Sequence, residues 1–248
     1  MPYAPHILAG MYGRHVTTPV LVQSAGALNF NGNITVNLGS TPTVGDTLLF
    51  IAIWSGLALT TTPLPSGVTV TASTPSYGTG ASTGCNLGTR IVQAGDGKAW
   101  VFPSAAWPYP YNVGGYGWNV GAVIEIQGTS AVYSWTPAAF PTLAAYAYGT
   151  LYWANVSYPS PAYYIITTEW YFNGGFSNPS WTPSSFGGLT SLFTALPNES
   201  GYGLPTYTPS GLCYAQSLAS EVGQIQTYIR NNSGGTSTYG QGMFVISK

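Results

Sequence analysis

Alternating and continuous apolar segments dominate the chain. Between Leu28 and Leu38, apolar residues and Gly32 alternate with Asn and Thr. This period of two residues is typical of a strand with one buried face in an antiparallel sheet. The segment Leu48–Trp54 is apolar at every position. It predicts a central strand that is covered on both faces.

Further strands are expected where β-branched and aromatic residues lie between turns rich in Gly, Pro and Ser. They are Val68–Ala72, Leu87–Val92, Trp118–Gln127, Tyr163–Phe172, Cys213–Ser220, Gln224–Arg230 and Gly242–Ser247. The segment nearest to a helical stripe is Ser217–Tyr228, and Gly223 with its β-branched neighbours argues against a helix there. The pattern predicts an all-β fold, an antiparallel β-sandwich or jelly roll.

The order of short motifs indicates an internal duplication. In each half an apolar strand is followed by a turn rich in Pro and Ser, a cysteine and a closing apolar strand. The first half carries Asp46–Phe50, Pro65–Val68, Cys85 and Gly121–Ile126, and the second carries Tyr163–Ile166, Trp181–Ser185, Cys213 and Gly242–Ile246. We expect an N-terminal arm over residues 1–19 and a sandwich over 20–248. Its pseudo-repeats cover about 20–130 and 160–248, joined by an aromatic-rich connection.

These motifs carry a resemblance to a family. Gly45–Leu49, Pro65–Val68 and Ala122–Ile126 follow the order found in duplicated β-sandwich modules of phage tail and other virion proteins and of microbial surface proteins. The chain resembles these modules over about residues 20–248, with Val68 where they have an aromatic residue. The resemblance implies attachment or structure, and no catalysis.

Charge is nearly absent from the chain. The 248 residues include only 5 Lys and Arg and 6 Asp and Glu, so that 4% are charged, compared with roughly 25% in an ordinary soluble domain. Polar side chains without a titrating group take their place, which suits acidic, saline or hot surroundings, such as those of a thermophile. A net charge of −1 supplies no basic surface for phosphates, and we expect no nucleic-acid partner. Low charge together with 15% aromatic residues favours association with other subunits.

The setting predicted by these features is a virion or an extracellular surface. The first residues show no secretory signal pattern, and no stretch is apolar for long enough to span a bilayer. We therefore expect a non-enzymatic structural subunit of a virion (capsid, decoration, fibre or tail component) or of an extracellular filament. Its partners would be copies of itself or other subunits, and no cofactor is expected. The alternative is a glycan- or receptor-binding module, with surface glycans as its partners.

Only a few charged residues and histidines are candidates for a catalytic, ion-pair or metal site. Glu125 and Glu169 could form the carboxyl pair of a glycosidase, with tryptophans lining a sugar platform. We prefer a structural ion pair between Arg90 and one of these two glutamates, because a strand-borne carboxylate needs a partner when it is buried. The two histidines, His6 and His15, have no acidic or cysteine neighbours that would complete a metal site.

Three further features are candidates for bonds, modification or contact. Cys85 and Cys213 take similar places in the two halves and could form a disulfide, or remain free buried thiols. The sequons at Asn33, Asn155, Asn198 and Asn231 are candidates for glycosylation. The aromatic residues Trp107, Tyr109, Tyr111, Trp118 and Trp181 are candidates for a contact surface toward subunits or sugars. With so few titrating groups, stability should change little between about pH 3 and pH 8.

Overall fold

The computed structural model describes fourteen separate segments of the chain. They are residues 19–29, 33–56, 64–77, 82–103, 119–128, 131–135, 142–143, 148–152, 162–172, 180–183, 190–194, 211–216, 225–230 and 237–247. Side chains are described mainly in 19–27, 33–53, 64–73, 85–103 and 120–128. Within these segments every regular element is a β-strand, and all strand pairs are antiparallel. The prediction of an all-β fold is confirmed at this level.

Sixteen strands make up the described structure. Those of the first half are β1 (Val20–Asn29), β2 (Ile34–Asn37), β3 (Thr47–Gly56), β4 (Thr69–Tyr77), β5 (Ser82–Ile91), β6 (Ala99–Phe102) and β7 (Asn119–Gln127). They continue with β8 (Ala131–Trp135), β9 (Thr142–Leu143), β10 (Tyr148–Tyr152), β11 (Ala162–Phe172) and β12 (Ser180–Pro183). The last four are β13 (Thr190–Thr194), β14 (Gly211–Gln216), β15 (Ile225–Arg230) and β16 (Ser237–Ser247).

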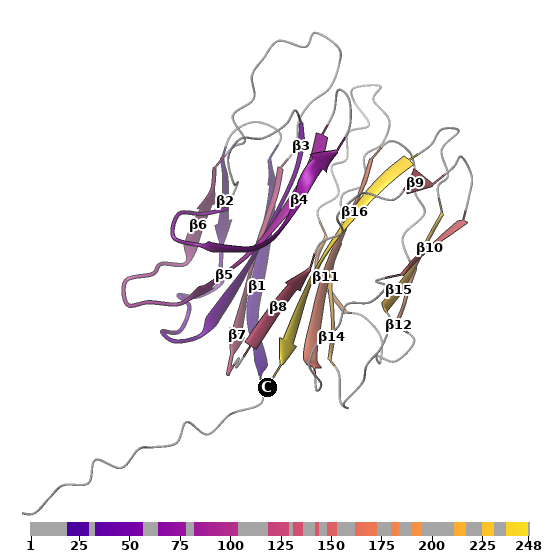
Figure 1. Cartoon of the computed structure of the whole chain (residues 1–248). Coiled ribbons are helices and arrows are strands. Elements are labelled where there is room, and N and C mark those ends of the chain that lie inside the picture. The colour runs from indigo at the N-terminus through magenta and orange to yellow at the C-terminus, as the bar shows by residue number, and fades with distance from the viewer. Residues whose placement is uncertain are drawn as a thin grey trace, which may run out of the picture.

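The strands form four sheets, and most neighbours in a sheet are distant in the sequence. The five-stranded sheet has the order β1-β7-β3-β5-β4, and β2 pairs with β6 in a two-stranded ribbon. The six-stranded sheet has the order β13-β14-β11-β16-β8, with β9 also paired to β16. The fourth sheet has three strands in the order β10-β15-β12. Figure 1 shows the β2–β6 ribbon on one side of the five-stranded sheet and strands β8, β16 and β11 on the other.

Strand β3 is the middle strand of the five-stranded sheet and is buried on both faces. Leu49, Ile51 and Ile53 point into a cluster that contains Phe244 and Ile246 of β16. The alternate side chains of β3 point into a second cluster, formed with the β2–β6 ribbon. That cluster contains Leu48, Phe50 and Ala52 of β3, Ile34 and Val36 of β2, and Trp100 and Phe102 of β6. The prediction of a central strand covered on both faces at Leu48–Trp54 is confirmed over the described side chains Leu48–Ile53.

In the second cluster, a glycine of the sheet makes room for an aromatic ring of the β2–β6 ribbon. Phe50 meets Trp100 edge to face, with ring centroids 5.0 Å apart, and lies 6.2 Å from Phe102. A Cβ atom added to Gly121 of β7 would stand only 2.9 Å from the Phe102 ring. Gly121 therefore supplies the space in which Phe102 packs against the sheet.

One predicted strand was wrong. The alternating segment from Leu28 to Leu38 is divided, because β1 ends at Asn29 and β2 begins at Ile34 in a different sheet. The alternation itself holds in β2, where Ile34 and Val36 are buried and Thr35 and Asn37 are exposed. Alternation of apolar and polar residues predicts which side chains are buried. It does not predict where the chain leaves one sheet and enters another.

Candidate functional site

A row of four side chains crosses the five-stranded sheet near the start of β3. Glu125 lies opposite Gln23 of β1 on one side and Leu48 of β3 on the other. Leu48 in turn lies opposite Arg90 of β5. Directly opposed residues share a face of the sheet, so all four point toward the layer that contains the β2–β6 ribbon. The row thus places one acidic residue, Glu125, and one basic residue, Arg90, at this end of the sheet.

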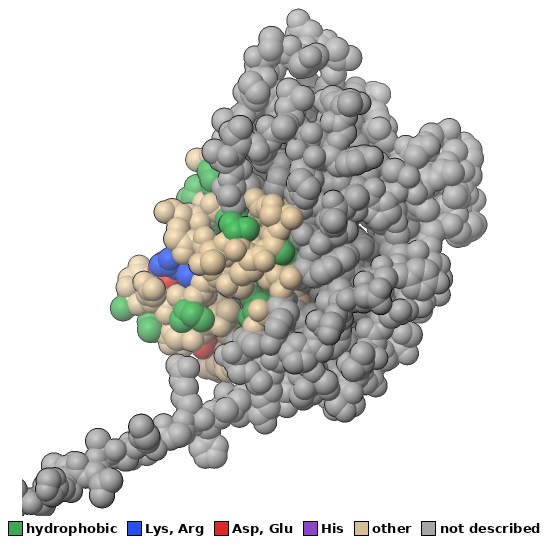
Figure 2. Space-filling model, viewed as in Figure 1, with side chains coloured by type: hydrophobic (Ala, Val, Ile, Leu, Met, Phe, Trp, Pro, Cys, Tyr) green, Lys and Arg blue, Asp and Glu red, His purple; other side chains and the backbone are tan. Residues whose placement is uncertain are grey.

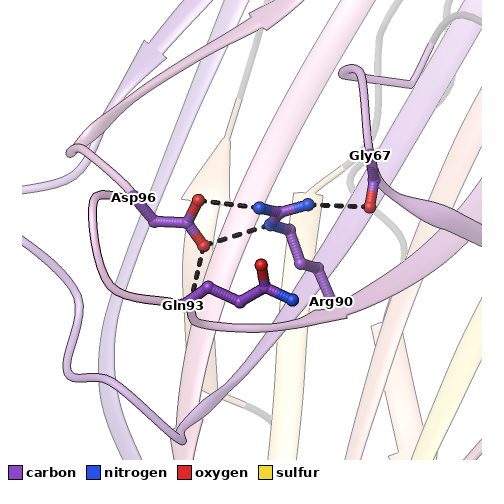
Figure 3. Close-up of polar contacts among 4 residues, drawn as sticks. All are labelled: Gly67, Arg90, Gln93 and Asp96. Atoms are coloured by element: carbon purple, nitrogen blue, oxygen red, sulfur yellow. Dashed lines mark hydrogen bonds and ion pairs between the residues drawn. The ribbon is translucent and has the colours of Figure 1, made fainter.

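Arg90 connects three segments at one end of the row. Its Nη2 and Nε atoms donate to the two carboxylate oxygens of Asp96 at 2.8 and 3.1 Å, and Nη1 donates to the carbonyl of Gly67 at 3.0 Å (Figure 3). The guanidinium also lies 5.8 Å from the centroid of the Trp100 ring. This hydrogen bonding raises the pKa of Arg90 and lowers that of Asp96. The backbone amide of Gln93 donates to Asp96 Oδ2 as well, at 2.9 Å, and this bond holds the turn after β5 in place.

The predicted partner of Arg90 was wrong. We expected Glu125 or Glu169, but the ion pair joins Arg90 to Asp96, with 20% and 13% of the two side chains exposed. Arg90 and Glu125 lie on strands separated by β3, which places their backbones roughly 10 Å apart. Asp96 lies in the turn that follows β5 and reaches the guanidinium directly. Glu169 lies on β11 opposite Gln241, in the six-stranded sheet.

Glu125 is fully buried between Leu48 and Gln23, the residue at the other end of the row, and has donors of its own. Its two carboxylate oxygens accept hydrogen bonds from the Thr43 amide at 2.7 Å and from Gln23 Nε2 at 2.5 Å. Gln23 also exchanges two hydrogen bonds with the backbone of Ser40. These contacts attach residues 38–46, which connect β2 to β3, to the end of the sheet. Glu125 has no exposed surface.

Asp46 brings a second carboxyl group to Glu125. Burial raises the pKa of Asp46 to about 6, and a hydrogen bond to Glu125 and the charge of that residue contribute further. Its Oδ2 atom is buried and has no hydrogen-bond donor among the described residues. A contact between two carboxyl groups can contain a hydrogen bond only when one of them is protonated. Asp46 therefore holds its proton more tightly than an exposed aspartate does.

Cys85 is a free thiol in this structure, which is the second of the two alternatives that the sequence left open for it. It lies on β5 opposite Ile53, is completely buried between the two large sheets, and belongs to the cluster that contains Phe244. Burial raises the pKa of Cys85 well above its usual value. Cys213 lies on β14 opposite Thr167, and its side chain is outside the described residues.

Most other predicted site residues fall outside the described side chains. Trp107, Tyr109, Tyr111 and Trp118 precede β7, and Trp181 is described only as part of the backbone of β12. Asn33 is exposed immediately before β2, and Thr35 of its sequon is exposed within β2. The sequons at Asn155, Asn198 and Asn231 lie outside the described segments. The aromatic contact surface and the glycosylation sites stay predictions.

The described part of the chain contains no group of three or more His, Cys, Asp and Glu side chains placed to bind a metal ion. It also contains no helix that is long and apolar enough to cross a membrane. Comparison of the chain with protein-family models, curated proteins and solved structures gives no significant match.

Two acidic residues that the sequence analysis did not single out, Asp46 and Asp96, are thus central to this end of the sheet. Four of the five charged side chains that are described face one another in two pairs, Asp46 with Glu125 and Arg90 with Asp96. Lys98, the fifth, is exposed. Figure 2 shows correspondingly little Lys, Arg, Asp or Glu colour on the described part of the surface. The arrangement can hold a proton and fix turns, and it leaves a surface that is almost uncharged.

Proposed function

We propose that the protein is a structural subunit of a virion or of an extracellular filament and acts through contacts with copies of itself or with other subunits. The observation that carries this proposal is that most of the described charged side chains lie inside the protein, near the start of β3, and not on its surface. Arg90 and Asp96 form an ion pair there, and the carboxyl groups of Asp46 and Glu125 are buried. Neutral polar groups and exposed apolar side chains make up most of the remaining described surface. Such a surface loses little hydration energy when it is covered by a partner.

Exposed apolar side chains support the same proposal. Val44, Val70, Ile91 and Val101 are between 42% and 64% exposed, and Val20 and Val22 on β1 are similarly open to solvent. Single exposed apolar residues are common in monomers. Combined with the near absence of charged side chains, they provide contact area without the repulsion that keeps soluble proteins apart.

The proposed architecture is a duplicated jelly roll, and the pairing of strands supports it. In the first half the pairs are nested, with β1 on β7, β2 on β6 and β3 on β5. The second half repeats the nesting with β8 on β16, β10 on β15 and β11 on β14. Nested antiparallel pairs are those of a long hairpin wound around itself, the arrangement of a jelly roll.

The two large sheets also agree strand by strand. The order β1-β7-β3-β5-β4 corresponds to β8-β16-β11-β14-β13, and corresponding strands follow the same sequence along the chain. Cys85 and Cys213 lie on the corresponding strands β5 and β14. A chain built from two such units presents two similar surfaces, a form that suits repeated contacts in a shell or filament.

Lysine substitutions on the exposed surface test the proposed role. Val70→Lys, Ile91→Lys and Val101→Lys would each be compared with Gln93→Lys, an exposed polar position in the turn after β5. We expect at least one of the three to abolish particles or filaments in negative-stain electron micrographs, because it buries a charge in a contact. The free energy of unfolding should stay within about 0.5 kcal/mol of the parent value. Particles that tolerate every substitution would contradict contacts through these positions.

A further inference from the structure

Exposed apolar side chains gather at one end of the five-stranded sheet. The strand register places the start of β1, the start of β3 and the end of β5 together at this end (Figure 1). Strands β1 and β5 are separated by two strands, so their backbones lie roughly 15 Å apart. Six large apolar side chains of the described residues are exposed. Four of them, between 45% and 64% exposed, lie here and form the end patch: Val20, Val22, Val44 and Ile91.

The turn that carries Val44 is fixed to the sheet by its backbone. The amide of Gly45 donates to the carbonyl of Val92 at 3.0 Å, and the amide of Val92 donates to the carbonyl of Asp46 at 2.9 Å. The amide of Asp46 also closes the turn by donating to the carbonyl of Thr43 at 3.0 Å. The most exposed side chain of the end patch is thus held on a preformed surface, and a partner that covers it loses little affinity to ordering of this turn.

The same end of the sheet has an excess of negative charge. At neutral pH its described charged groups are three carboxyl groups and two cations, which gives a net charge of −1. They are Asp46, Asp96, Glu125, Arg90 and Lys98. Residues 1–18 have the opposite sign, because Arg14 is their one charged side chain and both histidines of the protein, His6 and His15, lie among them. The two parts of the chain are therefore complementary in charge.

Residues 1–18 also have the length and the apolar content to cover the end patch. They lead through the buried Pro19 into the start of β1, at the end patch itself. Their larger apolar side chains are Ile7, Leu8, Met11, Tyr12 and Val16. Eighteen residues can span roughly 60 Å when extended. Pro19 disfavours a helical turn at the residue before it, which favours a segment that continues outward from β1 over one that turns back onto its own sheet.

We propose that residues 1–18 of one copy bind to the end patch of a second copy, an inference that rests on the proposed role as an assembling subunit. Burial of apolar side chains on both partners stabilises the contact. The difference in charge favours this contact over one between two end patches, because two ends of the same negative sign repel each other. The chain thus carries both halves of a head-to-tail contact, a segment at its start and a surface beside it.

Photo-cross-linking between two isotopic forms of the full chain tests this contact. The photoreactive residue p-benzoylphenylalanine replaces Val44 in an unlabelled chain, which is mixed with heavy-isotope-labelled parent chain and then concentrated. We expect mass spectrometry to find residue 44 joined to residues 1–18 of the labelled chain. The same probe at Val101, which is 48% exposed in the middle of β6, should not reach residues 1–18.

A reciprocal probe and a charged variant make the test independent of any change at Val44. The probe at Leu8 should join residues 38–46 of the labelled chain. Ile7→Asp combined with Leu8→Asp in the labelled chain should lower the yield from the Val44 probe by about tenfold or more, because two charges would have to be buried.

Three outcomes would overturn the contact. Cross-links to residues 1–18 that never join an unlabelled to a labelled chain would show that this segment covers its own copy. Cross-links between residue 44 and residues 38–46 of the labelled chain would show that two end patches meet. Larger species in sedimentation velocity without cross-links to residues 1–18 would contradict this contact alone and leave the proposed subunit role standing, whereas a chain that stays monomeric at every concentration would contradict both.

Discussion

Arg90 and Glu125 lie opposite the same residue, Leu48, on the two strands that flank β3, and they do not pair. Arg90 reaches away from the row to Asp96, in the turn that follows its own strand. Glu125 reaches the opposite way, to β1 and the connection between β2 and β3. Opposite charges in one row of a sheet thus bind nearby turns instead of each other, and each fixes a different part of the chain.

Arg90→Lys should destabilise the fold although it preserves the charge. A lysine cannot make the two hydrogen bonds to Asp96 and the bond to the Gly67 carbonyl at the same time. We expect the free energy of unfolding in urea to fall by about 1–2 kcal/mol. The exposed Lys98→Ala serves as the control, with a change within about 0.5 kcal/mol. Equal stability of Arg90→Lys and the parent would show that only the net charge at this position matters.

Gly67→Ala and Gly95→Ala form a matched pair of substitutions. Both glycines have positive φ angles, of 78° and 94°, so alanine strains the backbone at each position by about 1 kcal/mol. A Cβ atom at Gly67 would collide with Arg90 Nη1, whereas one at Gly95 would meet nothing within 4 Å. We expect Gly67→Ala to cost about 1 kcal/mol more in urea unfolding, because Arg90 loses its bond to the Gly67 carbonyl. Equal costs would mean that Arg90 moves aside freely.

Gly121→Ala should overpack the layer beneath the β2–β6 ribbon. The added methyl group would stand 2.9–3.1 Å from three atoms of the Phe102 ring, and Phe102 is itself buried. We expect a loss of about 1–3 kcal/mol in the free energy of unfolding. Gly97→Ala, with open space around its Cβ position, should be nearly neutral. Phe102→Leu combined with Gly121→Ala should cost less than the sum of the two single changes, and strict additivity would contradict this packing.

Stability should depend on pH through Asp46 in an unusual direction. Its pKa rises on folding from 3.8 to about 6, so the folded state binds the proton more tightly than the unfolded state. The resulting stabilisation is complete below about pH 4 and is lost as the pH rises through about 6, a change of about 3 kcal/mol. Asp96 has a lowered pKa and acts in the opposite sense, so its contribution is lost only as the pH falls below its usual range.

Thermal melting between about pH 3 and pH 8 measures this dependence. We expect the highest melting temperature near about pH 4 and a decrease toward neutral pH that disappears in Asp46→Asn. The sequence alone predicts little change over this range. A flat profile in the parent chain would support that simpler expectation and contradict the raised pKa of Asp46.

The sequence predicts best those strands whose own pattern of apolar residues shows which of their faces are buried. Strand β3 is apolar throughout because both of its faces are covered, and it could be predicted together with its central place in a sheet. Strand β6 alternates between exposed and buried over only four residues. That pattern is too short to separate from a loop.

The polar contacts could not be predicted because they depend on the register of strands that are distant in the sequence. Gln23 and Glu125 are 102 residues apart and meet only because β1 pairs with β7. Asp96 could have been suggested by its position six residues after Arg90, in the turn Gly95–Gly97. The strong strand positions of Glu125 and Glu169 drew attention to the wrong carboxylates instead.

Sedimentation velocity of the full chain tests the proposed structural role most directly. We expect discrete species larger than a monomer to appear as the protein concentration is raised. We also expect these species to persist at high salt, because few of the described charges are free to contribute to contacts. A single monomeric species at every concentration and salt level would contradict self-association as the function of this uncharged all-β surface.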